Sequence, residues 1–192
     1  MIKINLYDFD KTIYDGDSTA DFMKYILKKH PSTIRFMPRM GIAALKYALK
    51  IIDKTKMKEE FYSIFSSIDD IDKLLEEFWK THENKIKDFY LEKDHSNDII
   101  ISASPEFLLK PMTDKLKVKD MMASKVNKKT GKYEGINCHD VEKVRRLNEK
   151  YSNYKVMESF SDSITSDKPI LELAENAYQV KGKKLIKVKF KK

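Results

Sequence analysis

The sequence contains a single cysteine, Cys138, and only five glycines and five prolines among its 192 residues. One cysteine cannot form an internal disulfide, and so little glycine and proline excludes collagen-like and low-complexity chains. No uncharged apolar run reaches the roughly 18 residues that a membrane span needs. The first residues also lack the apolar centre of an export signal. We therefore expect a protein without a membrane span that works in the reducing cytoplasm.

Enough apolar material is present for a folded core beneath a strongly charged surface. Apolar residues make up 41% of the chain, aromatic residues 11% and charged residues 35%. This balance excludes a globally disordered chain. A length of 192 residues allows one domain with an inserted module, or two small domains.

The net charge of +8 is concentrated in two segments. Residues 28–58 contain nine basic residues and one acid, Asp53. The nine are Lys28, Lys29, Arg35, Arg39, Lys46, Lys50, Lys54, Lys56 and Lys58. The other basic segment, KGKKLIKVKFKK, ends the chain. Each segment is either a solvated face or a surface that attracts anions such as phosphorylated metabolites or membranes. We expect no nucleic-acid partner, because no nucleic-acid motif with interleaved aromatic residues accompanies these lysines.

Two strand-like segments enclose a long helical stretch. Residues 2–7, IKINLY, alternate in polarity, and residues 98–104, DIIISAS, contain a short apolar run typical of a buried parallel strand. Between them, apolar residues recur at helical spacing. A crossover between parallel strands needs only a dozen or so residues. The excess predicts a helical cap inserted at residues 14–95, with residues 1–13 and 96–192 forming the core domain.

Helices and strands alternate after the second strand. The expected helices are PEFLLKPMTDKL, HDVEKVRRLNEKY and KPILELAENA, and the expected strands are DMMASKV, YKVMESF, AYQV and LIKVKF. A turn-rich hairpin, NKKTGKYEG, has Gly131 at its tip. This alternation predicts an α/β fold with a Rossmann-like, mostly parallel sheet and helices on both of its faces.

Four polar segments lie at predicted strand ends or in the elements beyond them, where open parallel sheets place their sites. They are DFDKT with Asp8, Asp10 and Thr12, ISAS with Ser102 and Ser104, the helix that carries Lys143, and SDSITSD with Asp162 and Asp167. The first segment alone is a weak signal, because acidic residues are common in turns after strands. The four segments in this order are a much stronger one.

This ordered set resembles the haloacid dehalogenase superfamily of phosphohydrolases, and within it the phosphoserine-phosphatase-like subfamily. The resemblance covers essentially the whole chain, with the cap lying between the first and second motifs. Two positions depart from the family pattern. Lys11 follows Asp10 where many members have glycine, and Ser161 replaces the usual glycine before Asp162. Neither departure removes a reacting group.

The paired carboxylates of the first motif suit phosphoryl transfer. Two residues at i and i+2 of a strand face the same side, so Asp8 and Asp10 can both reach one substrate. The resemblance implies that Asp8 is the nucleophile, forming an aspartyl-phosphate, and that Asp10 is the general acid and base. It also implies that Mg2+ is bound by Asp8, the backbone carbonyl of Asp10 and Asp162. Mg2+ would offset the repulsion between phosphate and carboxylates, about 4 kcal/mol per pair at 4 Å.

Substrate binding is expected from further motif residues. By resemblance, Ser102 and Lys143 contact the phosphoryl oxygens, and Asp167 orients Lys143 or a metal-bound water. Thr12 either tightens the turn after Asp10 or takes a direct part in binding.

The cap is expected to close over the site as a lid and to contact the substrate beyond its phosphate. Arg35 and Arg39 are candidates for binding a carboxylate or a second phosphate. Asp15, Asp17 and Asp21 are candidates for binding an amine.

The leading interpretation is a magnesium-dependent phosphatase of a small phosphorylated metabolite, acting as a monomer or homodimer. One alternative is a phosphotransferase that passes the same phosphoryl group to an acceptor alcohol. Another is a catalytically weak module that docks on anionic surfaces through its basic cap. The joint presence of Asp8, Asp10, Lys143 and Asp162 disfavours this module, because a pure binding protein has no need of the carboxylates.

Overall fold

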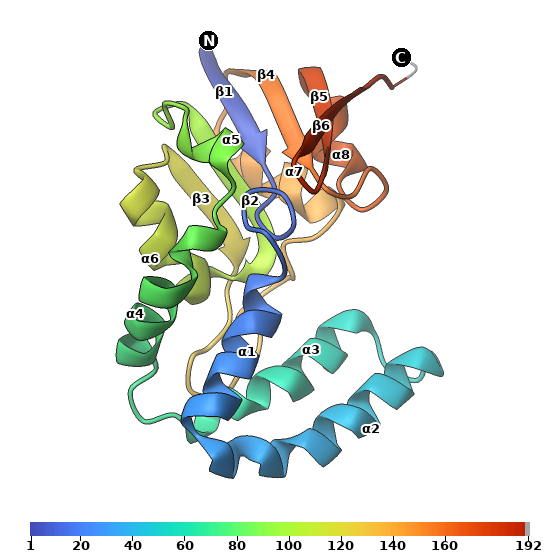
Figure 1. Ribbon diagram of the computed structural model, residues 1–192. Helices are drawn as coiled ribbons and strands as arrows, with labels where there is room; N and C mark the ends of the chain where they lie inside the picture. Colours follow the sequence, from blue (N-terminus) through green and yellow to red (C-terminus); the bar gives the residue numbers. More distant parts are fainter. Residues whose placement is uncertain (191–192) are drawn as a thin grey trace.

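The computed structural model describes residues 1–190, in which a central sheet is covered by helices (Figure 1). The six strands of this part of the chain have the order β3-β2-β1-β4-β5-β6. They are β1 (Ile2–Tyr7), β2 (Asp98–Pro105), β3 (Asp120–Ser124), β4 (Tyr154–Ser161), β5 (Ala174–Lys181) and β6 (Lys184–Val188). Neighbouring strands are parallel except β5 and β6, which form an antiparallel hairpin. The predicted mostly parallel α/β sheet is confirmed.

The chain between β1 and β2 is helical, as expected. Its α-helices are α1 (Ser18–Lys29), α2 (Met37–Ala48), α3 (Lys54–Tyr62), α4 (Ile71–His82) and α5 (Asp88–Leu91). Short 3-10 helices lie at Pro31–Phe36, Ser63–Ser67 and Glu83–Lys85. The helices after β2 are α6 (Glu106–Leu116), α7 (Val141–Lys150) and α8 (Lys168–Glu172).

The inner strands bury side chains on both faces of the sheet. On β2, Ile100 belongs to the same apolar cluster as Leu108 of α6. Its neighbours Ile99 and Ile101 belong to a second cluster, together with Leu147 of α7. Because successive strand residues point to opposite faces, an uninterrupted apolar run requires helices on both sides.

The last predicted helix is shorter than expected. KPILELAENA was expected to be helical throughout, and this prediction is wrong, because α8 ends at Glu172 and β5 begins at Ala174. Ala174 pairs with Val156 and Asn176 with Glu158 of the adjacent strand β4. Backbone pairing with β4 therefore overrides the helical preference of the segment. Intrinsic helical preference is weak compared with tertiary contacts.

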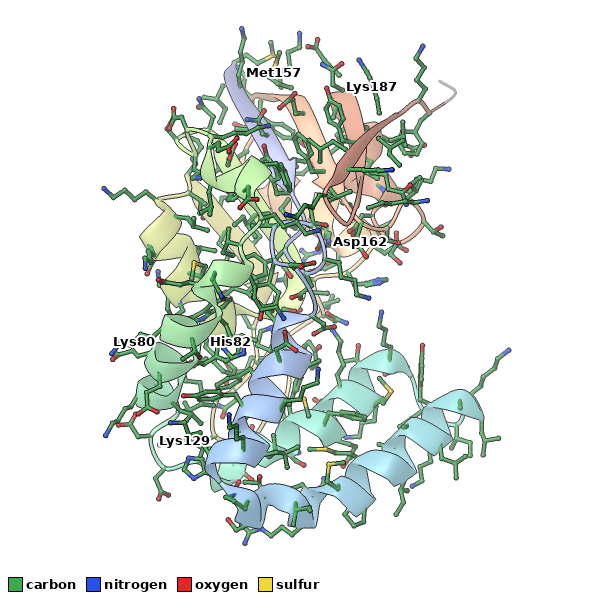
Figure 2. The ribbon with its side chains drawn as sticks, viewed as in Figure 1. Lys80, His82, Lys129, Met157, Asp162 and Lys187 are labelled. Atoms are coloured by element: carbon green, nitrogen blue, oxygen red, sulfur yellow. The ribbon has the colours of Figure 1, made fainter. Side chains whose placement is uncertain are left out.

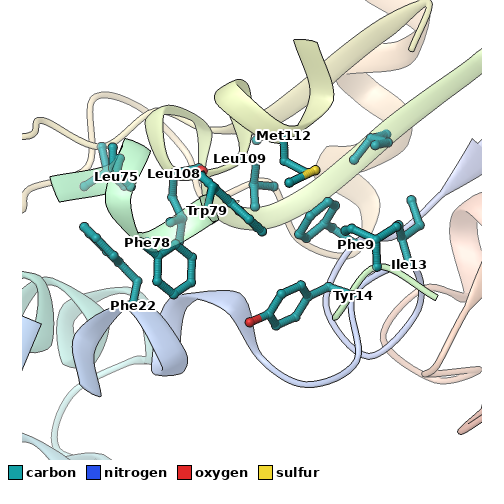
Figure 3. Packing of buried hydrophobic residues seen from close by; sticks show 14 of the residues in the cluster. Phe9, Ile13, Tyr14, Phe22, Leu75, Phe78, Trp79, Leu108, Leu109 and Met112 are labelled. Carbon is teal, nitrogen blue, oxygen red and sulfur yellow. The ribbon is translucent and has the colours of Figure 1, made fainter. Parts of the chain in front are cut away.

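Part of the helical insertion shares one apolar core with the rest of the protein. Figure 3 shows Phe22 of α1 and Phe78 and Trp79 of α4 packed near Leu108 and Leu109 of α6. The indole nitrogen of Trp79 also donates a hydrogen bond to the backbone carbonyl of Leu108 at 2.8 Å. The helices α1 and α4 are therefore joined to the core, whereas α2 and α3 pack together as a hairpin that projects from it (Figure 1). The division at residues 14 and 95 stays a prediction.

A loop between β3 and α7 touches the end of this α2–α3 hairpin. Tyr133 donates its backbone N–H to Oε1 of Glu59 at 3.1 Å. Gly131 has a φ of +70°, and a Cβ atom there would lie 2.3 Å from the carbonyl oxygen of Tyr62. This close backbone approach and left-handed conformation together require glycine at the tip of the loop.

We expect Gly131→Ala to lower the free energy of unfolding by about 3 kcal/mol. About 1 kcal/mol comes from the left-handed backbone and about 2 kcal/mol from the clash with Tyr62. Gly182→Ala is the matched control, because Gly182 also has a positive φ, +58°, but faces open space. Urea unfolding of both variants checks the prediction. Equal losses in the two would contradict the close packing of the loop on α3.

Candidate active site

The predicted motif residues meet at the carboxyl ends of the parallel strands, which share one edge of the sheet. A cavity of about 440 Å³ opens there. It is lined by Asp8, Asp10, Ser102, Lys143, Asp162 and Asp167. Figure 2 places Asp162 between the sheet and the α2–α3 hairpin. Segments far apart in the sequence are thus brought to one site by the strand order.

Two ion pairs join Lys143 to carboxylates from different strand ends. Its Nζ atom lies 2.8 Å from Oδ1 of Asp8 and 2.6 Å from Oδ1 of Asp167. The Lys143 side chain is only 2% exposed. Burial disfavours the charged lysine, but Asp8 and Asp167 outweigh this effect and raise the pKa of Lys143 above its usual value. Lys143 therefore remains a cation in the site.

The pKa of Asp8 lies above the usual range of a carboxyl group. Burial raises the pKa of Asp8 to about 7, the ion pair with Lys143 opposes this shift, and the nearby Asp167 and Asp10 add to it. Burial also raises the pKa of Asp162, and Asp167 adds to this shift as well. The raised pKa values of Asp8 and Asp162 show that the nearby lysines do not fully compensate the burial and mutual repulsion of these carboxylates.

The same carboxylates fit a divalent cation. Asp8, Asp162 and Asp167 each offer an oxygen, and these oxygens lie within 4.8 Å of one another. Carboxylate oxygens are hard ligands of the kind that Mg2+ prefers. The carboxylate of Asp10 is not part of this cluster, and metal binding by its backbone carbonyl stays a prediction. Asp167, which was expected to orient Lys143 or a metal-bound water, lies in the cluster itself.

The carboxylate of Asp10 is held by α1 and β2 instead. The backbone N–H of Ser18 donates to its Oδ1 at 2.6 Å, and the hydroxyl of Ser104 donates to its Oδ2. Burial raises the pKa of Asp10, and the charge of Asp17 adds to the shift. A carboxyl that lines the same cavity with a raised pKa is suited to donate and accept a proton.

Thr12 connects the first and fourth motifs. Its hydroxyl lies 3.4 Å from Oδ2 of Asp8 and accepts a hydrogen bond from the backbone N–H of Asp162 at 2.8 Å. The side chain is completely buried. Thr12 therefore links the carboxylate of Asp8 to the backbone of Asp162, and a direct part in substrate binding stays a prediction.

Both departures from the family pattern have a structural consequence. Lys11 has a φ of 59°, in the left-handed region, which explains why glycine is common at this position in the family. Its backbone N–H donates to the carbonyl of Gly16 at 2.7 Å. Ser161 donates its hydroxyl proton to Oδ2 of Asp167 at 2.6 Å, so it orients the carboxylate that pairs with Lys143.

Lys58 also lines the cavity, although no motif in the sequence singled it out from the other basic residues of its segment. Lys58 belongs to α3, and its Nζ donates to the backbone carbonyl of Ala103 at 3.1 Å. Burial and the neighbouring Lys54 lower the pKa of Lys58 to about 8. Nothing in the basic segment distinguishes this lysine from its neighbours, since only the packing of α3 places it at the site.

Most of the other cap residues that were expected to bind substrate do not line the cavity. Arg35 and Arg39 line a separate groove between α2 and α3. Asp17 lines the cavity, and its side chain also caps α1 by accepting from the backbone N–H of Ala20. Asp21 is paired with Lys85. The structure therefore brings only one of the cap acids, and neither arginine, to the cavity wall.

The family is decided by a match that spans most of the chain. A model of haloacid dehalogenase-like hydrolases matches residues 6–172. The chain belongs to this family. The expected family is therefore confirmed. No curated protein matches the sequence.

Solved structures share the fold of this haloacid dehalogenase-like hydrolase. A protein of unknown function from Bordetella pertussis Tohama I has a TM-score of 0.77 at 17% identity, covering 92% of this chain and 89% of that one. A phosphoserine phosphohydrolase-like protein from Francisella tularensis has a TM-score of 0.59 at 17% identity, covering 92% and 86%. A probable phosphoserine phosphatase from Vibrio cholerae has a TM-score of 0.65 at 14% identity, covering 92% and 55%. The family match shows a hydrolase, and these structures show its fold. Among residues 1–190 of the hydrolase, no helix is long and apolar enough to cross a membrane.

We expect Lys143→Met to lower the free energy of unfolding by about 3 kcal/mol near neutral pH, because it leaves buried carboxylates without their cation. The loss should grow as pH rises. Without the lysine, burial holds the folded-state pKa of Asp8 further above its unfolded value, so stability falls as pH rises between these two values. Urea unfolding from pH 5 to 8 measures this dependence.

The control for this substitution is Lys110→Met. Lys110 pairs with Asp114 on the surface, with both side chains 61% exposed. Its removal should cost less than about 1 kcal/mol at every pH. A Lys143→Met variant that behaves like this control would contradict the central role of the buried ion pairs.

Proposed function

We propose that the protein is a magnesium-dependent phosphatase that hydrolyses a small phosphorylated metabolite through an aspartyl-phosphate on Asp8. The observation that carries this proposal is the buried ammonium group of Lys143, held between Asp8 and Asp167 in the wall of a cavity. Membership of a hydrolase family supports the reaction type. The cytoplasm, and a monomer or homodimer, stay our predictions for compartment and assembly.

In the first step, an oxygen of Asp8 attacks the phosphorus atom, and the bond from phosphorus to the leaving oxygen breaks. Asp10 donates its proton to that oxygen as the alcohol departs. In the second step, Asp10 takes a proton from water, whose oxygen attacks the phosphorus. The bond to Asp8 then breaks, which releases phosphate and restores both aspartates.

Positive charge must accompany the phosphoryl group through both steps. Lys143 can contact a phosphoryl oxygen while Asp167 and Ser161 hold its ammonium group in place. We propose Asp8, Asp162 and the backbone carbonyl of Asp10 as Mg2+ ligands, with the nearby Asp167 as a further carboxylate. When bound, Mg2+ would supply additional positive charge against the phosphoryl oxygens.

We propose that Ser102 donates a hydrogen bond to the phosphoryl group. Its hydroxyl oxygen accepts from the backbone N–H of Ser104 at 3.1 Å. This contact orients the hydroxyl through a lone pair and leaves its proton available to a phosphoryl oxygen.

The cavity favours a small substrate. Its volume of about 440 Å³ lies at the lower end of the range for small-molecule sites. Its cap wall combines charged and apolar side chains: Asp17, Thr19, Met23, Lys54, Met57, Lys58 and Phe61. We propose that Lys58 binds an anionic or polar oxygen of the substrate beyond the reacting phosphate.

Phosphate release from a panel of phosphorylated metabolites tests the proposed reaction. We expect turnover that requires Mg2+, disappears with EDTA and falls to background in Asp8→Asn, which keeps shape but removes the nucleophile. Asp10→Asn should reduce kcat by about 10²- to 10⁴-fold, the usual contribution of a general acid. Circular dichroism of each variant checks that it is folded.

Two outcomes would redirect this proposal. Full activity of Asp8→Asn would contradict the aspartyl-phosphate. Phosphoryl transfer to an added alcohol, in large excess over release to water, would identify the phosphotransferase alternative.

The best substrate of that panel also tests Lys58. We expect its KM to rise as pH increases through about 8, because Lys58 loses its charge there. Lys58→Ala should raise KM about tenfold at pH 7, the value of one charge-assisted hydrogen bond. Lys58→Arg should keep a low KM at alkaline pH, because arginine stays charged.

Lys56→Ala is the matched control on the same helix, since Lys56 is half-exposed and pairs with Glu59. Its KM should match that of the unmodified chain at each pH. Equal effects of the two alanine variants would indicate a general loss of positive charge and contradict a specific contact from Lys58.

A further inference from the structure

The helix α2 is apolar on its outer side as well as its inner side. Met40 and Ala43 are buried toward the protein. Ile42, Leu45 and Leu49 are 56%, 60% and 61% exposed. Ile42 and Leu45 lie on one stripe of the helix at i, i+3 spacing, and Leu49, which caps the C-terminus of the helix, continues this stripe at i+7. Figure 1 shows α2 on the outer side of the hairpin, with α3 between it and the sheet.

This stripe, which we term the α2 apolar face, is extended by exposed residues near both ends of the helix. Met37 at its start and Ile51 just beyond its end are 47% and 65% exposed. Single exposed apolar residues are ordinary on a protein surface, but a contiguous group of them is typical of a contact surface. None of the described residues 1–190 covers the stripe, because each of its three side chains is more than half exposed.

A positively charged groove adjoins the α2 apolar face. It has a volume of about 430 Å³, lies between α2 and α3, and includes Ile42 in its lining. Its charged lining comprises the four cations Arg35, Arg39, Lys46 and Lys56 and the single carboxylate Glu60. Glu60 is paired with Arg39. The groove thus keeps an excess of positive charge directly beside exposed apolar side chains, and it contains both arginines that do not reach the catalytic cavity.

We propose that the α2 apolar face and this basic groove dock on a bilayer that contains anionic phospholipid. Ile42, Leu45 and Leu49 would enter the boundary between headgroups and acyl chains, while the groove receives headgroup phosphates. An apolar stripe flanked by Lys and Arg is the pattern of helices that lie in a membrane surface. The proposal concerns binding alone and does not depend on the catalytic reaction.

Charge complementarity favours a lipid surface over a second copy of the chain. Residues 28–58 contain nine basic residues and one acid, so a symmetric dimer through α2 would bring two strongly positive segments together. An anionic bilayer instead lowers the free energy of each lysine or arginine near its surface. With 12 residues, α2 is too short to cross a bilayer and would lie along its surface.

Co-sedimentation with vesicles tests the docking. We expect the full chain to bind vesicles of phosphatidylglycerol and phosphatidylcholine, to bind pure phosphatidylcholine at least tenfold more weakly, and to dissociate as salt is raised. The combined change Ile42→Ser, Leu45→Ser and Leu49→Ser should lower partitioning at least tenfold. Replacing Arg35 and Lys46 by Ala should lower it about fivefold per charge removed.

Two matched controls separate this face from general properties of the surface. Val141→Ser removes an apolar side chain that is 68% exposed on α7. Lys183→Ala with Lys184→Ala removes the same number of charges from the basic β5–β6 hairpin. Both controls should partition within about twofold of the unmodified chain. Circular dichroism verifies the fold of every variant.

Direct insertion can be measured with a label on α2. Cys138 is completely buried, so a cysteine introduced as Leu45→Cys can be labelled selectively with an environment-sensitive dye. We expect a blue shift in its fluorescence when phosphatidylglycerol vesicles are added. A label at Val141→Cys should show no shift.

Several results would overturn the proposal. These are absent binding to phosphatidylglycerol vesicles at low salt, equal losses in the control variants, and no shift from the label at residue 45. A concentration-dependent dimer that the triple serine change abolishes would instead identify a self-interface. Displacement from vesicles by millimolar glycerol phosphate, with no effect of the serine changes, would show that the groove binds a soluble anion.

Discussion

The burial of one lysine between two carboxylates is the constraint on which the site depends. Lys143 can stay charged out of water only because Asp8 and Asp167 lie within 2.8 Å of its ammonium group. This requirement ties β1, α7 and the loop after β4 together, since each supplies one of the three groups. Two carboxylates around one lysine also leave a net negative charge, which a divalent cation would offset.

The helical insertion performs two different tasks with its parts. The helices α1 and α4 share the apolar core of α6, and α1 also contributes side chains to the wall of the cavity. The projecting α2–α3 hairpin carries Lys58 on the side that lines the cavity and Leu45 on the side that is exposed. A hairpin built in this way can support a substrate contact and a surface contact at once, because its two helices separate them.

Local patterns account for most of the fold and for the reacting groups. The alternation of IKINLY, the apolar run in DIIISAS and the helical stripes between them predicted β1, β2 and the helical insertion. The prediction of a helix over the whole of KPILELAENA was wrong because the last residues of this segment pair with β4. Backbone pairing there outweighs helical preference. The prediction of β2 was confirmed because a strand buried on both faces has a continuous apolar run. The first half of β5 has no such run, so its sequence did not indicate a strand.

The sequence alone determined the ordered motifs that contain Asp8, Asp10, Lys143 and Asp162, and with them the resemblance to the family, because these residue types stand at or beyond the ends of recognisable strands. Only the tertiary structure decided which of the basic cap residues reach the cavity. Lys58 lies there, whereas Arg35 and Arg39 line the groove on the outer hairpin. Helical periodicity indicates which residues share a face of α2 or α3. The element that packs against that face depends on long-range contacts, which cannot be inferred from a local pattern.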